Sequence, residues 1–312
     1  FLSQSTIEDR IKKKIIMSTT QHGITFKKLH PVLGGEVSGL DLKQPLTTEQ
    51  VNHINQLWAK ANGILIFKKQ YLNEQELKNY SRYFGHVLKH PFIEGDTNDM
   101  KHSDTEMMTI GTKARNDLWH SDMTWMRFPP KATFLQCADR DDGDFGDTMF
   151  CSLSNTYNKL SPGLQSILEK MTCMHGVQDL MSRYDEKTMG DKLYPNGLGA
   201  MSKIKNEHPA VIIHPNTGKK SLYVNNWPCK RFAGMSQSET APLKQYLMDL
   251  AIQPDNVYRH KWDIGDLVMI DQRCTMHYAF HDYDDTKQKR IMQRTTLTDA
   301  GDSPGKYIYT NF

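Results

Sequence analysis

Hydrophobic positions recur along the chain with two different periods, which separate many short strands from a few helices. Short apolar or alternating runs bounded by turn residues are typical of strands, whereas helices show apolar residues spaced three and four apart. Strands are expected at 24–29, 64–67, 132–137, 210–213, 221–224, 258–262 and 267–270. Helices are expected after the capping residues Thr47, Asn73, Ser161 and Ser236. This pattern predicts a mainly β fold with flanking helices, arranged as a double-stranded β-helix (jelly roll).

The order of these elements indicates one domain. We find no internal repeat and no linker, so residues 17–312 are predicted to form a single domain. Residues 178–208 are polar, rich in Met, Gly and Lys, and lack a clear period. We interpret them as a long insert that covers the functional site as a lid. Residues 1–16 are interpreted as an extra N-terminal segment, since no signal-peptide apolar region follows their lysines.

Composition and charge exclude several classes of protein. Hydrophobic residues make up 38% and charged residues 24%, as in ordinary soluble globular proteins. The net charge is +3 and the basic residues are dispersed, so nucleic acid is not an expected partner. No apolar run is long enough to cross a membrane. The five cysteines show no Cys-x-x-Cys spacing, which argues against a disulfide framework or a zinc site and favours a cytoplasmic location.

The triplet His120-Ser121-Asp122 is the strongest candidate for chemistry. In an extended segment residues i and i+2 point to the same side, so His120 and Asp122 can reach one metal ion. A distant histidine, His277, follows the predicted strand 267–270. Two histidines and one carboxylate form the ligand face of non-haem iron(II) oxygenases, which leaves other positions open. These residues therefore predict an iron(II) site, although a purely structural His120–Asp122 pair remains an alternative on the triplet alone.

A second triplet, His102-Ser103-Asp104, has the same spacing. With thirteen histidines in the chain, about one such match is expected by chance, so spacing does not decide between the two. His102 and Asp104 lie in a polar stretch, 94–106, that we interpret as a surface loop. His120 and Asp122 are flanked by Trp119, Met123 and Trp125, as expected at the mouth of a packed core. We therefore assign the metal to the second triplet along the chain.

Two further groups of residues suit the binding of anions. Gly146-Asp147-Thr148 combines a glycine turn with a hydroxyl donor. Arg290 and Arg294 lie four residues apart on a predicted strand, so both side chains point to one face. Guanidinium groups facing a core need anionic partners, and arginine binds carboxylates through two parallel hydrogen bonds. The alternative is a pair of surface arginines on an edge strand.

Taken together, the motifs resemble a known family in their order along the chain. The series comprises 34–42, Phe84-Gly85, His90-Pro91, Trp119-His120-Ser121-Asp122, Gly146-Asp147-Thr148, Thr275-Met276-His277 and 290–294. From about residue 24 to residue 298, the chain resembles the taurine and phenoxyacetate dioxygenase (TauD/TfdA) family of Fe(II)- and 2-oxoglutarate-dependent oxygenases. An ordered series of this kind is more specific than any single motif.

The resemblance implies a role for each matching residue. The expected iron ligands are His120, Asp122 and His277. Thr148 and Arg290 would hold the distal carboxylate of 2-oxoglutarate, and Arg294 would face an anionic group of the substrate or cosubstrate. The expected substrate contacts are His90 and Asn116. Phe92 and Ile93 stand where taurine enzymes have a tyrosine contact, which argues against taurine itself.

These residues predict an enzyme with Fe(II) as cofactor and 2-oxoglutarate and O2 as cosubstrates. It would oxidise an unactivated C–H bond of a small anionic substrate, a carboxylate or sulfonate, and release succinate and CO2. Asp122 as a ligand argues against halogenation. One alternative is a biosynthetic desaturase or oxidative cyclase of an amino-acid-like substrate. Another is a non-catalytic jelly-roll protein that binds a metal or a small acid. The identity of the substrate and a homo-oligomeric state remain open.

Overall fold

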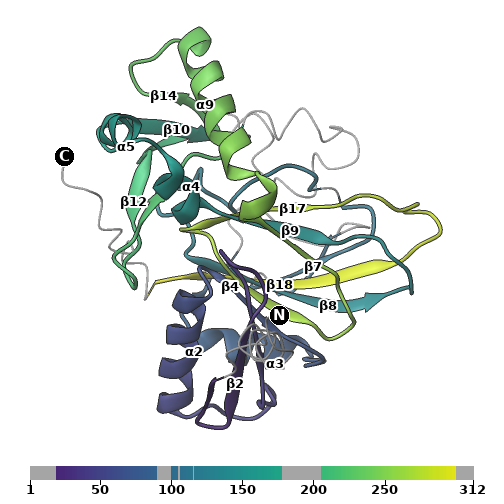
Figure 1. Ribbon diagram of the computed structural model, residues 1–312. Coiled ribbons are helices and arrows are strands. Elements are labelled where there is room, and N and C mark those ends of the chain that lie inside the picture. The colour runs from purple at the N-terminus through teal and green to yellow at the C-terminus, as the bar shows by residue number, and fades with distance from the viewer. Residues whose placement is uncertain (1–18, 90–99, 105, 115, 178–204, 300–312) are drawn as a thin grey trace, which may run out of the picture.

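The computed structural model describes residues 19–89, 100–104, 106–114, 116–177 and 205–299 (Figure 1). The predicted extra segment 1–16, the candidate residue His90 and residues 178–204 of the predicted lid lie outside this description. None of the helices in the described ranges has the length and apolar character needed to span a membrane.

A large sheet forms one layer of the described structure. Its ten strands run in the order β1-β2-β3-β4-β16-β8-β18-β7-β6, with β5 paired to β18. Neighbouring strands are antiparallel except β3 and β4, which are parallel. The strands are β1 (Thr19–Gln21), β2 (Ile24–Lys28), β3 (Gly35–Ser38), β4 (Ile64–Phe67), β5 (His86–Val87), β6 (Met100–Asp104), β7 (Met107–Ile110), β8 (Ala132–Arg140), β16 (Leu267–Asp271) and β18 (Arg290–Thr298).

A smaller antiparallel sheet faces the large one and completes the jelly roll. It contains β15 (Val257–His260), β9 (Thr148–Ser152) and β17 (Thr275–Ala279), in that order. Phe150 of β9 packs in one buried cluster with side chains of the large sheet, including Ile66, Val268 and Met292. This apolar layer holds the two sheets together, because each sheet buries one face against the other. The prediction of a mainly β fold with flanking helices is confirmed.

Two helices cover the outer face of the large sheet (Figure 1). They are α2 (Thr48–Lys60) and α3 (Glu74–Arg82). The predicted caps Thr47 and Asn73 both form capping boxes, in which cap and third residue satisfy each other's backbone N–H groups. The apolar faces of both helices pack on Phe134 and its neighbours in the sheet.

The remaining helices and two small sheets cover the outer face of the smaller sheet. The helices are α4 (Leu153–Lys159), α5 (Pro162–Leu168) and α9 (Gln237–Ala251), and a 3₁₀ turn η1 spans Pro254–Asn256. The strands are β10 (Thr172–Gly176), β11 (Lys205–Pro209), β12 (Val211–Ile213), β13 (Lys220–Leu222) and β14 (Cys229–Phe232). Residues 205–208, the last part of the predicted insert, lie in β11 and pair with β10.

The stretch around His102 also differs from its prediction. Residues 100–104 form strand β6 at one edge of the large sheet, where they pair with β7, instead of a surface loop. The polar composition of this segment did not predict a strand. An edge strand pairs with a neighbour on one side only and tolerates charged residues, so it lacks the apolar pattern of a buried strand.

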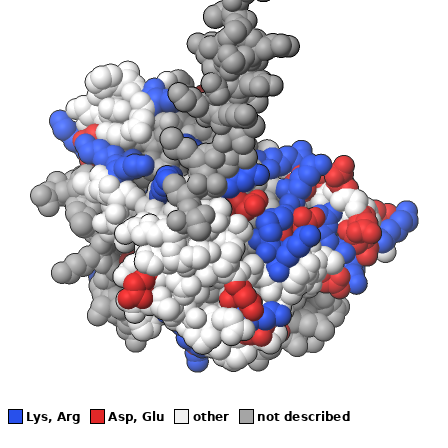
Figure 2. All heavy atoms as spheres, turned by 60° about the horizontal axis from the view of Figure 1, so that its bottom comes forward, with Lys and Arg blue, Asp and Glu red and all other residues white. Residues whose placement is uncertain are grey.

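Charged side chains on the surface are mixed in sign. Figure 2 shows basic and acidic groups next to each other on one face of the molecule. Ion pairs of the described residues include Lys261–Asp144 and Lys289–Asp139, both with N–O distances of 2.9 Å.

Candidate metal centre

Three predicted ligands from two distant segments meet between the sheets. His120 forms an isolated antiparallel bridge with His277 of β17. The backbone N–H of His120 donates to the His277 carbonyl over 3.1 Å, and the His277 N–H returns a bond of 2.8 Å. The expected extended segment stops at His120, since Asp122 lies in a turn and Met123 has a φ of 52°. The turn still brings the Asp122 carboxylate to the two rings.

The donor atoms of His120, Asp122 and His277 face one another. Asp122 Oδ1 lies 3.4 Å from His120 Nε2 and 3.9 Å from His277 Nε2. The three ligand atoms all lie within 4.8 Å of one another, and all three side chains are buried. Two imidazole nitrogens and one carboxylate oxygen at this spacing match the two-histidine, one-carboxylate face that non-haem iron(II) uses.

Two side chains that sequence reasoning did not assign hold the Asp122 carboxylate. Thr133 Oγ1 donates to Oδ2 over 2.6 Å, and Gln272 Nε2 donates to the same oxygen over 2.9 Å. Gln272 Oε1 also accepts the backbone N–H of Asp122 over 2.8 Å. Because Oδ2 is occupied by these donors, Oδ1 is the oxygen left for a metal ion. Neighbours of this kind orient a metal ligand and tune its basicity.

The two histidines are in a form that can bind a metal. His120 Nδ1 lies 2.6 Å from the carbonyl of Leu118, and a carbonyl can only accept, so Nδ1 carries the proton. In the neutral ring, which is the form that binds a metal, Nε2 presents its lone pair toward Asp122. Burial first, and then the neighbouring His120 ring, lower the pKa of His277 to about 3, although Asp122 acts in the opposite direction. His277 is consequently neutral near pH 7, as a ligand must be.

Arg294 of β18 approaches the same carboxylate from another side. Its Nη2 lies 3.5 Å from Asp122 Oδ2, and its Nε donates to Thr296 Oγ1 over 3.2 Å. Burial alone raises the pKa of Asp122, but Arg294, followed by His277 and His120, holds it well below its usual range. Asp122 is therefore ionised, and Arg294 already has one anionic neighbour within the protein.

Arg290 lies on the same face of β18 and contacts the predicted glycine turn. Its Nε donates to the Gly146 carbonyl over 2.9 Å. Gly146 has a φ of 65°, and a Cβ at this position would lie 2.6 Å from Arg290 Cδ. Only glycine combines this backbone conformation with so close an approach. Burial lowers the pKa of Arg290, and none of its neighbours among the described residues forms an ion pair with it.

Thr148 follows two residues after Gly146, at the start of β9. Its buried hydroxyl accepts a hydrogen bond from Trp262 Nε1 over 2.9 Å. Side chains from two other segments hold Gly146 and Asp147, the residues just before Thr148. Arg259 Nε donates to Asp147 Oδ2 over 2.6 Å, and the Gly146 N–H donates to Asp282 Oδ1 over 2.7 Å. These contacts fix the backbone of the turn 146–148, which joins the carbonyl bound by Arg290 to Thr148.

Asn116, a predicted substrate contact, lies beside the metal-facing nitrogen of His120. Its Nδ2 is 2.8 Å from His120 Nε2. With a neutral His120 ring the Asn116 amide donates to Nε2, and the amide would have to turn away for a metal ion to bind at that nitrogen. The structure thus brings Asn116 to the centre, whereas His90 lies outside the described residues.

A buried ion-pair network fixes the turn that carries Gln272. Arg273 binds both carboxylate oxygens of Asp271, through Nε at 2.8 Å and Nη2 at 2.6 Å. His214 Nε2 lies 2.9 Å from Asp271 Oδ2. Burial alone raises the pKa of Asp271, but Arg273 and then His214 hold it far below its usual range. With both oxygens occupied, Asp271 acts as a structural anchor for the segment between β16 and β17.

The chain is similar to known dioxygenases over most of its length. Residues 25–296 match the model of the family described as "Taurine catabolism dioxygenase TauD, TfdA family". An alkylsulfatase of Acinetobacter baylyi is 30% identical, covering 90% of this chain and 87% of the relative. An alpha-ketoglutarate-dependent 2,4-dichlorophenoxyacetate dioxygenase of Cupriavidus pinatubonensis is 29% identical, covering 87% and 97%. The crystal structure of a taurine dioxygenase from Burkholderia xenovorans superimposes with a TM-score of 0.73 at 26% identity, covering 89% and 91%.

Proposed function

The chain belongs to the taurine catabolism dioxygenase TauD, TfdA family, and we propose on this basis that it oxidises an unactivated C–H bond of a small organic anion. It is an Fe(II)- and 2-oxoglutarate-dependent dioxygenase that uses O2. The proposed substrate is a carboxylate, a sulfonate or a sulfate ester, and the products from the cosubstrate are succinate and CO2. The observation that carries the proposal is the convergence of His120, Asp122 and His277 beside Arg294.

We assign the binding of iron to His120 Nε2, Asp122 Oδ1 and His277 Nε2. The donor set fits Fe(II), because it combines two imidazole nitrogens with one carboxylate oxygen, and the second carboxylate oxygen is already hydrogen-bonded. Bound there, Fe(II) supplies the activation of O2 that is coupled to decarboxylation of 2-oxoglutarate. Three ligands on one face leave the other coordination positions to the cosubstrates.

Arg290 is the proposed partner of the distal carboxylate of 2-oxoglutarate. Its guanidinium is buried and donates to a neutral group, the carbonyl of Gly146. A buried cation is stabilised by an anion that it can bind through two hydrogen bonds. Thr148 lies near the same turn and has a hydroxyl that can donate to the carboxylate while it accepts from Trp262. The two residues together provide a charged and a neutral donor.

Arg294 is the proposed partner of the anionic group of the substrate. Its contact with Asp122 is 3.5 Å long, so the guanidinium retains N–H donors for a second anion. The names of the relatives agree with such a group, because they include an alkylsulfatase and a 2,4-dichlorophenoxyacetate dioxygenase. Asn116 would line the same space once its amide leaves His120. His90 is assigned there by family resemblance.

Turnover with a matched set of organic anions tests this function. Purified protein with Fe(II), 2-oxoglutarate and O2 is incubated with alkyl sulfates, alkanesulfonates and aryloxyalkanoates, and succinate is measured. We expect one class to stimulate succinate release well above the rate without substrate. Hydroxylation of the carbon bound to the ester or ether oxygen would also release sulfate or a phenol, which gives an independent readout.

The corresponding neutral alcohols and methyl esters are the controls in this assay. Stimulation by the neutral compounds as strong as by the anions would contradict the proposed substrate class. Absence of iron-dependent succinate release with every compound, and without any, would contradict the proposed assignment of the metal and cosubstrate sites.

A further inference from the structure

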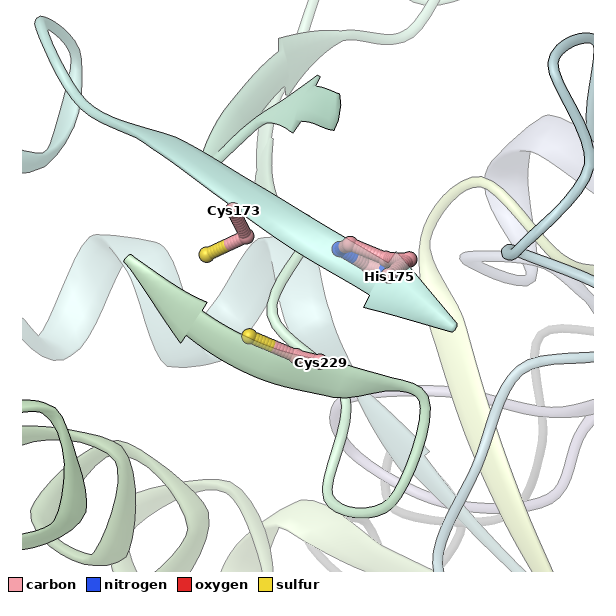
Figure 3. A group of neighbouring side chains, drawn as sticks. All are labelled: Cys173, His175 and Cys229. Atoms are coloured by element: carbon pink, nitrogen blue, oxygen red, sulfur yellow. The ribbon is translucent and has the colours of Figure 1, made fainter. Parts of the chain in front are cut away.

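Two cysteines and a histidine form a second group of metal-ligating side chains. Cys173 and His175 lie two residues apart on β10, and Cys229 lies on β14, opposite His175. Figure 3 shows the sulfur atoms of Cys173 and Cys229 pointing into the space between the two strands, with a nitrogen of His175 on the side facing them. One ligand atom from each residue lies within 4.8 Å of the others, and all three side chains are fully buried.

His175 has one ring nitrogen whose hydrogen-bonding capacity is unused. Its Nδ1 lies 2.9 Å from Thr124 Oγ1. Its Nε2 is buried and has no hydrogen-bond partner within the described part of the chain. A buried polar atom without a partner costs about 1–3 kcal/mol, so a ligand bound by the His175 ring at this nitrogen would remove that cost. Burial first, and then His208, hold the pKa of His175 well below its usual range, which leaves the ring neutral.

The surroundings of the two thiols favour loss of a proton. Lys244 Nζ donates to the carbonyl of Cys229 over 3.0 Å and to that of Asn226 over 2.8 Å, which places a positive charge beside the pair. The neighbouring Cys173 thiol, and after it Lys244, lower the pKa of Cys229. Burial, followed by Cys229, raises the pKa of Cys173. A metal ion that binds both sulfur atoms displaces the protons that they still carry.

We propose that Cys173, His175 and Cys229 bind a thiophilic d¹⁰ cation, Zn(II) or Cu(I), at a site separate from the iron centre. Two sulfurs and one imidazole form a soft donor set, whereas the iron centre offers two nitrogens and an oxygen. Bonds of about 2.3 Å to sulfur place two thiolates roughly 4 Å apart around one ion. The present separations therefore need little adjustment. Binding releases one proton for each thiol that is still protonated, and no redox step is involved.

The proposed ion would brace the segment that carries the iron ligands. Thr124, bonded to His175, lies two residues after Asp122. Asn225, four residues before Cys229, accepts the backbone N–H of Ser121 through its side chain. One of these contacts comes from β10, through His175, and the other from the residues just before β14, through Asn225. An ion bound by β10 and β14 would therefore connect the two parts of the chain that hold residues 121–124. We expect the bound ion to raise the midpoint of thermal unfolding, because it binds the folded state alone.

Sulfur coordination in the wild-type chain is the decisive measurement. The protein is loaded with Zn(II), with Cu(I) or with Co(II) as a spectroscopic substitute for zinc, and excess metal is removed by gel filtration. We expect X-ray absorption to show sulfur neighbours around bound Zn(II) or Cu(I), and Co(II) to give a thiolate charge-transfer band. The iron centre contains no sulfur, so it does not contribute to either signal. Retention in competition with a chelator then distinguishes which of the two ions the site holds more tightly.

Matched cysteine variants locate the signal. Cys229→Ser and Cys173→Ser are expected to lose it, together with one equivalent of bound metal and the thermal stabilisation. Cys151→Ser is the control, since Cys151 is equally buried in the same apolar cluster but outside the group. Nitrogen and oxygen neighbours alone in the folded wild type would overturn the proposal, and so would a sulfur signal unchanged in both Cys173→Ser and Cys229→Ser. The wild-type result stands even if a variant fails to fold.

Discussion

His120 and His277 exchange both of their backbone hydrogen bonds, although 157 positions of sequence numbering separate them. This pairing holds the two rings with centroids 4.2 Å apart and sets both nitrogens toward Asp122. The backbone, and not only the side chains, thus arranges the proposed iron ligands before any ion binds. Preorganisation of this kind lowers the cost of ordering ligands on binding.

Removing any one of the three proposed ligands is expected to abolish iron-dependent turnover. His120→Ala, Asp122→Ala and His277→Ala each leave two protein ligands on an ion that needs three. Bound iron, measured on the purified protein, and succinate release should both fall to background. His102→Ala and Asp104→Ala are the matched controls from the other His-x-Asp triplet. Loss of iron in these controls, with retention in His120→Ala, would show that the wrong triplet was assigned.

Gln272 and Thr133 are expected to set iron affinity without touching the ion. Gln272→Leu removes one hydrogen bond to Asp122 Oδ2 and one to its backbone N–H, and Thr133→Val removes the other bond to Oδ2. Loss of such supporting contacts typically weakens metal binding by about 10–100-fold. Titration with Fe(II) under anaerobic conditions measures the change.

A buried glutamine of β8 provides the control for Gln272, which lies in the turn between β16 and β17. Gln136 is equally buried, but it bonds to Leu72 and Gln293 and makes no contact with Asp122. Gln136→Leu should reduce stability and leave iron affinity unchanged. Equal losses of affinity in Gln136→Leu and Gln272→Leu would indicate a general effect of unfolding instead of a local one.

Arg290→Ala is expected to raise the apparent KM for 2-oxoglutarate. Truncating one partner of a buried charge pair costs about 2–5 kcal/mol, which corresponds to at least about a 25-fold change. Thr148→Ala removes a neutral hydrogen bond of about 1 kcal/mol and should raise KM about fivefold. Titrations of 2-oxoglutarate at saturating Fe(II) compare the two. Equal and negligible shifts would refute both assignments.

Arg294→Gln is expected to impair substrate-coupled turnover and to weaken iron binding modestly. The guanidinium serves a proposed substrate anion, but it also lies 3.5 Å from Asp122 and helps to keep that carboxylate ionised. Iron affinity is therefore measured first, and coupling of succinate release to substrate oxidation is measured at saturating iron. Arg294→Lys should restore part of the coupling. An acid and its methyl ester turned over equally well by the wild type would contradict a role in anion recognition.

Asp271 makes part of the free energy of unfolding depend on pH in the acid range. Its pKa is depressed in the folded state by Arg273 and His214, so its contribution is fully present above the ordinary value of about 3.9. The contribution is lost as the pH falls below that value toward the folded pKa, because the unfolded state then binds the proton more readily. Asp271→Asn should lower the free energy of unfolding by about 3–5 kcal/mol at neutral pH, since it leaves Arg273 buried without its partner.

The same variant should reduce the slope of unfolding free energy against pH in the acid range. Denaturant titrations at several values between about pH 5 and pH 3 measure that slope. Asp144→Asn is the control, since Asp144 forms an exposed pair with Lys261. A slope in Asp271→Asn equal to that of the wild type would contradict the role assigned to Asp271.

Local chemistry allowed much of the fold to be predicted from the sequence. Thr47, Asn73 and Ser236 were identified as helix caps because a capping box depends only on residues three positions apart. The strands around 64–67 and 267–270 followed from short apolar runs that need burial on both faces. The His-x-Asp spacing, its apolar flanks and then the order of the motifs singled out His120, Asp122 and His277, which the structure brings together.

The sequence could not predict side-chain contacts between distant segments, because these depend on how the strands pair and pack. Gln272 and Thr133 meet Asp122 because three segments pack together, and neither residue belongs to a pattern of its own. Strand β6 escaped prediction because its polar residues lie at a sheet edge, where pairing and not burial decides the structure.

The cysteines show most clearly the difference between what the sequence predicted and what the tertiary structure decided. Without Cys-x-x-Cys spacing the sequence predicted no soft-metal site, yet the pairing of β10 with β14 places Cys229 beside Cys173 and His175. The sequence by itself thus determined local caps, strands and the family of the iron centre, since these depend on short-range spacing or on the order of motifs. Only the tertiary structure decided which distant side chains meet at one site, because the register between strands is set by packing over the whole chain.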